Sequence, residues 1–83
     1  MNDSQKEMRR FTRLLALRDE LCPDFVVDWS LENKGNFVLR FSFLQNVWQP
    51  DPYGTYDGKI GPYFSKEAAE IACKMLNSGE VEL

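Results

Sequence analysis

Histidine is absent from this 83-residue sequence, and cysteine occurs only twice, as Cys22 and Cys73. Without histidine or a Cys-x-x-Cys pair, the chain lacks the side chains that most zinc sites and most general bases use. It also lacks the glycine-rich phosphate loop, the GxSxG elbow and the HExxH helix that mark common enzyme classes. These absences argue against an enzyme, and we expect neither a metal ion nor a cofactor.

Long apolar runs are missing as well. No segment approaches the roughly 20 apolar residues of a membrane span. The N-terminal sequence MNDSQKEMRR also contains no apolar stretch of the kind that a secretory leader needs. We therefore expect a soluble, cytoplasmic protein with no membrane association. In that reducing compartment, Cys22 and Cys73 are expected to be small core residues, with a disulfide as the minority interpretation.

Positive charge is scarce overall, since 10 basic side chains stand against 13 acidic ones and the net charge is −3. The first 18 residues nevertheless carry a balance of +3, and the rest of the chain carries −6. The chain is therefore a charge dipole, with a basic N-terminal segment on an acidic body. The acidic body disfavours nucleic acid as a partner, because it repels phosphate.

A helix is predicted from Asp3 to about Leu21, capped by Asp3 or Ser4 and stopped by Pro23. On a helical wheel its apolar residues cover about half the circumference, and four basic residues share the opposite arc. This basic surface comprises Lys6, Arg9, Arg10 and Arg13. Three leucines lie to one side of the main apolar stripe, and we predict that they form a homodimer interface: Leu14, Leu17 and Leu21.

Alternating apolar residues predict two strands, residues 25–32 and 37–44, joined as a hairpin by the Gly/Asn turn between them. A third strand is expected at residues 59–64, where Pro62 favours the edge of a sheet. Ser65 then caps a helix that ends at the Asn-Ser-Gly sequence before Glu80.

The predicted fold class is α+β, in the order α-β-β-β-α, with a three-stranded antiparallel meander packed against helices. We expect a single domain over residues 1–83. Its parts are an N-terminal amphipathic helix (1–22), an antiparallel sheet (23–64) and a C-terminal helix (65–79).

The connection VWQPDPYGTYDG, residues 47–58, is long in this prediction, because most hairpin loops have only about 2–5 residues. Its prolines stiffen it, and its tryptophan and tyrosines supply contact area at low entropic cost, as in protein-binding hot spots. Its aspartates are also ordinary turn residues. We predict a partner-binding site here, made of Trp48, Asp51, Tyr53, Tyr56 and Asp57.

The sequence IGPYFSKEAAEIA, from Ile60 onward, resembles the C-terminal signature of small uncharacterised phage and prophage proteins of bacteria. In that Tyr-Phe-Ser-x-Glu-x-Ala pattern an aromatic strand ends, a serine caps, and a Glu/Ala-rich helix follows. The sequence PDFVVDW, from Pro23 to Trp29, is similar too, and the resemblance covers roughly residues 20–77. It implies a virus-derived accessory protein, a class that often blocks a host enzyme or defence system by binding it. The Pro-rich insert at residues 45–58 departs from the pattern, and no catalytic residues come with it.

We accordingly expect a phage-type accessory protein that binds and inhibits a host protein without catalysis. The expected partner is a defence nuclease, which would make the activity anti-CRISPR-like. Two alternatives stay open. One is a nucleic-acid-binding regulator that uses the basic surface of the first helix, and the other is a small-ligand sponge with its pocket at a dimer interface.

Overall fold

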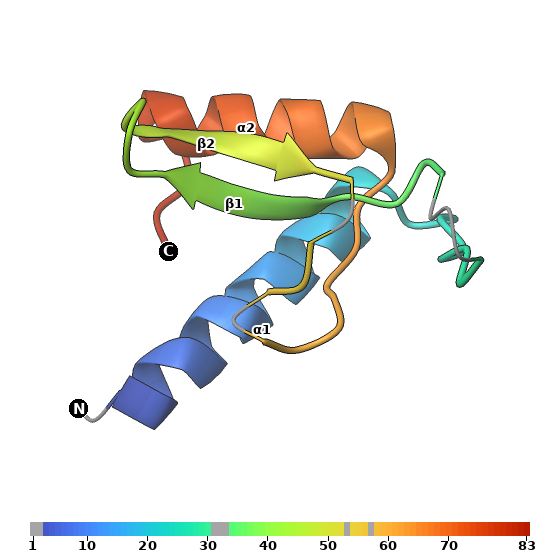
Figure 1. Ribbon diagram of the computed structural model, residues 1–83, viewed down its shortest axis with the longest axis horizontal. Coiled ribbons are helices and arrows are strands. Elements are labelled where there is room, and N and C mark those ends of the chain that lie inside the picture. The colour runs from blue at the N-terminus through green and yellow to red at the C-terminus, as the bar shows by residue number, and fades with distance from the viewer. Residues whose placement is uncertain (1–2, 31–33, 53, 57) are drawn as a thin grey trace.

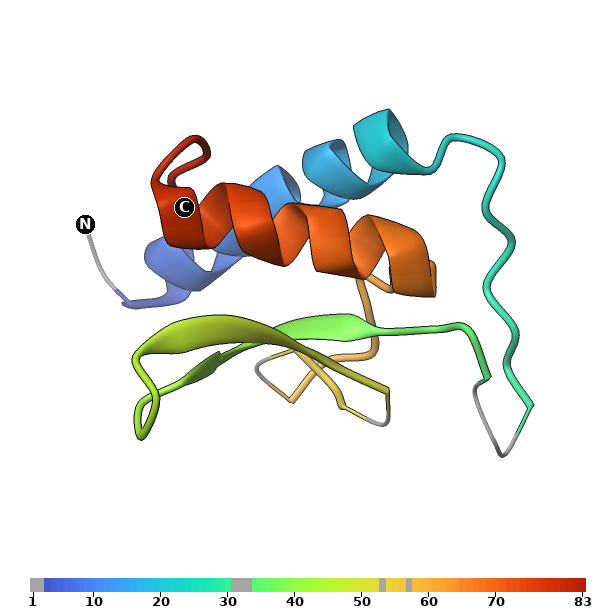
Figure 2. The ribbon, with the colours of Figure 1, turned by 90° about the horizontal axis from the view of Figure 1, so that it is seen from above.

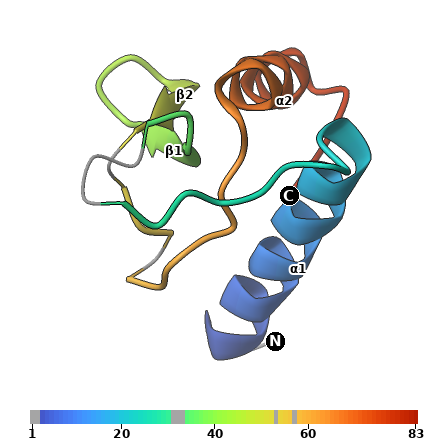
Figure 3. The same cartoon turned by 90° about the vertical axis from the view of Figure 1, so that its right-hand side faces the viewer.

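The computed structural model describes residues 3–30, 34–52, 54–56 and 58–83. These residues form an α+β fold with the order α1 (Asp3–Leu21), β1 (Val38–Ser42), β2 (Val47–Asp51) and α2 (Lys66–Ser78) (Figure 1). Both helices lie on the same side of the β1–β2 hairpin, as Figures 2 and 3 show from two directions. Neither described helix has the length and apolar character that crossing a bilayer requires.

Helix α2 begins and ends where local sequence signals place it. The Ser65 hydroxyl accepts a hydrogen bond from the Ala68 N–H at 3.2 Å, which satisfies one of the free amides of the first turn. At the other end, Gly79 adopts a left-handed conformation with φ 82°. The face of α2 toward the sheet is lined by small buried side chains, which allow a close approach: Ala68, Ala69, Ala72 and Cys73.

Leucines of helix α1 pack in the core of the monomer. Leu14 and Leu17 are only 1% and 5% exposed, and Leu21 packs against the same cluster. The prediction that Leu14, Leu17 and Leu21 form a homodimer interface is therefore wrong for the first two, which have almost no surface left to offer. The wheel alone could not show this, because the second apolar face is covered by elements distant in sequence.

The hairpin does not lie where the alternation pattern predicts it. Strands β1 and β2 pair antiparallel from Val38 opposite Asp51 to Ser42 opposite Val47, so β2 occupies the segment that we expected to be a loop. Residues 43–46 form the turn, and Asn46 has a positive φ of 56°, which asparagine tolerates better than most residues. Pro50 is accommodated because β2 lies at the edge of a sheet of only two strands.

The predicted strand at residues 25–32 is wrong over its described part, residues 25–30, which are irregular. Here the Asp28 carboxylate accepts hydrogen bonds from the backbone N–H and the hydroxyl of Ser30, a local turn that competes with strand pairing. Residues 31–33 of this expected strand and turn lie outside the described residues. Alternating apolar residues alone do not form a strand here, because no neighbouring strand pairs with residues 25–30.

The three-stranded meander is also wrong, because the described residues contain only two strands. What remains of the expected third strand is two isolated antiparallel bridges. Lys59 pairs with Tyr56 at one end, and at the other end Phe37 and Phe64 exchange backbone hydrogen bonds of 2.8 and 2.6 Å. Pro62 follows a cis peptide bond after Gly61, and proline has no N–H to extend the ladder. In the described residues, isolated bridges therefore stand in place of the expected strand.

The core contains a free cysteine whose chemistry burial alters. Desolvation raises the pKa of the Cys73 thiol to about 11, whereas Cys22 is half-buried. We expect iodoacetamide at mildly alkaline pH to label native Cys22 well before Cys73, because only the thiolate reacts. A Cys22→Ser variant isolates the Cys73 signal, and equal labelling rates in the wild-type chain would contradict the burial.

The same pKa shift makes the free energy of unfolding depend on pH. The unfolded thiol ionises near its ordinary pKa of 9.0, while the folded thiol stays protonated to about 11. The native state therefore binds more protons between these values, and the free energy of unfolding should fall as the pH rises through this range. Chemical denaturation of the wild type and a Cys73→Ala variant at increasing pH checks this contribution.

Candidate functional site

Three aromatic side chains gather at the turn end of the hairpin, and we call them the aromatic patch: Phe41, Phe43 and Trp48. Phe41 lies opposite Trp48 across the strands, with ring centroids 5.7 Å apart and planes at 68°. Phe43 meets Phe41 edge to face at 5.1 Å. Edge-to-face contacts of this kind stabilise aromatic pairs and hold the rings in defined orientations.

Helix α2 fixes the backbone of Trp48. The Asn77 side-chain oxygen accepts a hydrogen bond from the Trp48 N–H at 2.7 Å, and its NH₂ group donates to the Trp48 carbonyl at 3.1 Å. The amide thus replaces a neighbouring strand at this edge of the sheet. Trp48 is therefore held in place at the surface while its side chain stays half-exposed.

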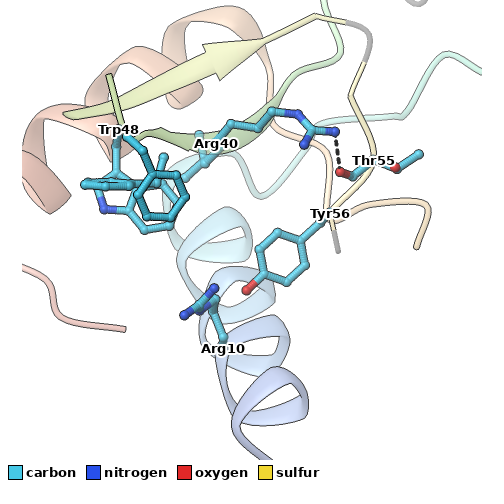
Figure 4. A pocket seen from close by; sticks show the side chains of 8 residues that line it. Arg10, Arg40, Trp48, Thr55 and Tyr56 are labelled. Atoms are coloured by element: carbon cyan, nitrogen blue, oxygen red, sulfur yellow. Dashed lines mark hydrogen bonds between the residues drawn. The ribbon is translucent and has the colours of Figure 1, made fainter. Parts of the chain in front are cut away.

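A pocket of about 270 Å³ lies between the hairpin and helix α1. Its walls combine apolar and aromatic side chains with two arginines and two hydroxyl-bearing residues: Arg10, Leu39, Arg40, Phe41, Phe43, Trp48, Thr55 and Tyr56. Figure 4 shows Arg10 rising from α1 on one side of this pocket and Arg40 from β1 on the other. A positive charge on each side makes the pocket suited to an anion.

Arg40 is held at the pocket by two partners. Its Nε lies 2.5 Å from the Asp51 carboxylate, and its Nη2 donates to the Thr55 carbonyl at 2.6 Å. These contacts order the guanidinium and partly neutralise it. Asp51, which we predicted as a site residue, is thus half-buried and forms an ion pair with Arg40.

Tyr56 is buried, with 6% of its surface exposed. Its ring packs at 6.0 Å from Phe11, and its backbone pairs with Lys59. Its hydroxyl is buried and has no hydrogen-bond partner among the described residues. Figure 4 shows that hydroxyl directed toward Arg10. The prediction of Tyr56 as an exposed anchor is wrong, and the structure makes it a core residue that lines a pocket.

The other predicted site residues are Tyr53 and Asp57 and the basic surface of α1. Tyr53 and Asp57 lie outside the described residues. The basic surface is exposed on α1 as expected, with Lys6, Arg9, Arg10 and Arg13 all accessible. Arg10 belongs to the same pocket as Trp48 and Tyr56, so the basic surface and the aromatic residues are adjacent rather than separate. Arg13 donates to the Glu82 carbonyl at 3.1 Å, which ties the C-terminal tail to α1.

Sequence reasoning missed Phe41, Phe43 and Leu44 as site residues. Period-two alternation assigned the two phenylalanines to a buried sheet face, yet Phe43 is 89% and Leu44 99% exposed. One signal pointed the other way. Asn46 is a good residue for a turn with positive φ, and it separates two short runs of β-forming residues.

Metal binding finds no support in the described ranges, where no three histidine, cysteine, aspartate or glutamate side chains are grouped to hold an ion. Comparison of the chain with protein-family models finds no match. Comparisons with curated proteins and with solved structures find no match either. The interpretation of the site therefore depends on its own chemistry, which is that of an aromatic surface flanked by two arginines.

Proposed function

We propose that this protein is a non-catalytic binding protein that captures and inhibits a host protein through the turn of its hairpin. The observation that carries the proposal is the exposure of Phe43 and Leu44, two large apolar side chains at the outermost point of the hairpin. Water disfavours such exposure, and in the monomer the edge-to-face contact with Phe41 covers only a small part of the Phe43 ring. Burial in a pocket of a partner would recover that free energy.

The surroundings of Phe43 have the composition of a binding hot spot. Trp48 and Phe41 stand behind it with defined ring geometry, and arginines flank them. Tryptophan and arginine are the residues most enriched where a few contacts supply most of the binding energy. The fixed backbone of Trp48 also reduces the entropy lost on association.

The charge of the surface indicates the chemistry of the partner. Arg10 and Arg40 line the hollow beside the aromatic patch, so complementary partner residues would be acidic. The surface also contains an acidic group, because the Asp51 carboxylate pairs with Arg40. This mixture favours a protein partner over a nucleic acid, whose uniform phosphate charge would meet a carboxylate as well as arginines.

The resemblance to small phage accessory proteins supports a bacterial host protein as the target, with a defence nuclease as the specific candidate. Both cysteines are free thiols, which suits action in the reducing host cytoplasm. Inhibition would be stoichiometric, because the protein would act by occupying a surface and would have no turnover of its own.

The test compares capture of host proteins by the wild type and by a Phe43→Ser/Leu44→Ser variant. We expect the variant to lose capture by about tenfold or more, as loss of hot-spot anchors does. Its melting temperature should stay close to the wild-type value, because both side chains are exposed. The captured protein is then identified, and its nuclease activity is titrated with this protein toward a one-to-one endpoint.

The matched control is Val26→Ser, which removes an apolar side chain that is 84% exposed at a different place on the surface. It should capture the partner as the wild type does. Equal capture by the double variant would overturn the proposal. Binding of a labelled single-stranded oligonucleotide, with an affinity that falls steeply with salt, would support the nucleic-acid alternative in its place.

A further inference from the structure

We infer that the pocket between Arg10 and Arg40 binds a small anion in which one aromatic ring system is joined, directly or through a sugar, to one phosphate or carboxylate group. This ligand site lies within one monomer and does not depend on a protein partner. Three independent features of the pocket carry the inference: an unsatisfied hydroxyl, an unpaired charge and an aromatic wall.

The unsatisfied group is the hydroxyl of Tyr56. Buried polar atoms in native proteins are almost always hydrogen-bonded, so an exception calls for an explanation. This oxygen is buried without a partner among the described residues, and it is directed toward Arg10 (Figure 4). A ligand oxygen placed beside Arg10 would accept a hydrogen bond from this hydroxyl.

The unpaired charge is that of Arg10. Arg40 is partly neutralised by Asp51 and ordered by the Thr55 carbonyl. Arg10 faces the same pocket, and within the described parts of the chain its guanidinium has neither an ion pair nor a hydrogen bond. An anionic group between the two arginines would therefore pair mainly with Arg10, while the ordered Arg40 would add a second donor at little entropic cost.

The third feature, the aromatic wall, favours a ligand that contains an aromatic ring. Phe41, Phe43 and Trp48 form one wall of the pocket, and aromatic side chains favour a stacked planar ligand. The volume of about 270 Å³ is at the lower end of the range of small-molecule sites. It suits one ring system with one charged group and is too small for a dinucleotide.

The two sources of this chemistry, nucleotides and aromatic acids, are separated by the choice of probe. The four nucleoside monophosphates and indole-3-carboxylate are titrated into the protein and followed by calorimetry. A Trp29→Phe background makes Trp48 the sole tryptophan, so quenching of its fluorescence reports stacking in the pocket. We expect at least one of these probes to bind, and adenosine or inorganic phosphate alone to bind about tenfold more weakly, since each lacks one of the two recognised features.

Two variants locate the ligand. Tyr56→Phe keeps the ring in the core and removes only the hydroxyl, and we expect it to weaken binding about fivefold without lowering the melting temperature. Arg10→Gln should weaken binding about tenfold or more, because it removes the charge that pairs with the anion. Arg9→Gln is the matched control, since Arg9 lies one residue away on the same exposed helix and does not line this pocket.

Two results would overturn the inference. One is the absence of binding by every probe. The other is equal weakening by Arg9→Gln and Arg10→Gln, which would indicate diffuse attraction to the helix. The ligand site and the proposed capture of a host protein can fail separately, because Leu44 does not line the pocket. A Leu44→Ser variant should weaken capture and leave binding of the small anion unchanged.

Discussion

Replacement of Phe64 by alanine is expected to lower the free energy of unfolding by about 3–5 kcal/mol, the usual range for truncating a buried phenylalanine. Phe64 is the largest of the fully buried side chains, and it lies where the end of the connection from β2 meets β1 and α2. Its truncation opens a cavity that a core of this size cannot refill. The backbone bridge to Phe37 remains, so the loss measures packing alone.

That loss is large against the total stability of the chain. At about 0.05–0.15 kcal/mol per residue, a protein of this length has roughly 4–12 kcal/mol in all. Urea denaturation followed by circular dichroism measures the change. Phe43→Ala is the matched control, because it removes the same atoms from a side chain that is 89% exposed. It should lower stability by no more than about 1 kcal/mol, the order of its edge-to-face contact with Phe41. Similar losses for the two variants would contradict the assignment of the core.

Replacement of Gly54 by alanine is expected to cost about 1–3 kcal/mol, the usual penalty for overpacking. A Cβ at this position would lie 2.6 Å from Val38 Cγ2, 2.6 Å from Arg40 Nε and 2.7 Å from Asp51 Oδ2. Val38 is fully buried and cannot move aside, and the two charged groups are held by their own ion pair. Gly54 is therefore required by space rather than by backbone conformation.

A double-mutant cycle identifies the cause of that loss. In a Val38→Ala background the closest methyl group is gone, so Gly54→Ala should cost less than it does in the wild type. Denaturation of the four proteins gives the coupling free energy. Costs that add without coupling would show that Val38 is not the obstacle. Because the clash also displaces Arg40, the Gly54→Ala variant should bind small anions less well than the wild type.

Local chemistry explains why the helices could be predicted and the sheet could not. The Ser65 cap, the Gly79 stop and the spacing of apolar residues act within a few residues, and the structure confirms both helices. A strand needs a partner, and the partner of β1 was hidden in a segment rich in proline and glycine. The expected strand beginning at Phe25 has the right alternation. The Asp28 turn forms there instead, because no neighbouring strand supplies hydrogen bonds to this segment.

The site shows the same division. The sequence indicated Trp48 as a surface aromatic and Arg10 as part of a basic helix face, because composition and periodicity are enough for such assignments. It could not indicate that Arg10 lies beside Trp48 and Tyr56, since this proximity depends on how α1 packs against α2 and against Tyr56. Nor could it separate the buried Tyr56 from the exposed Phe43, because burial depends on contacts between residues far apart in the chain.

The sequence by itself thus determined the uneven distribution of charge, the two helices and the caps of α2, because helical signals act between near neighbours. The predicted caps of α1, Asp3 or Ser4, lie within that helix instead. The tertiary structure decided which strands pair, which aromatic rings are core and which arginine shares a pocket with them. Those outcomes depend on the packing of distant segments, in which each apolar face is covered by whatever element the chain brings to it. The paired strand within VWQPDPYGTYDG and the pocket beside Arg10 are both results of that packing.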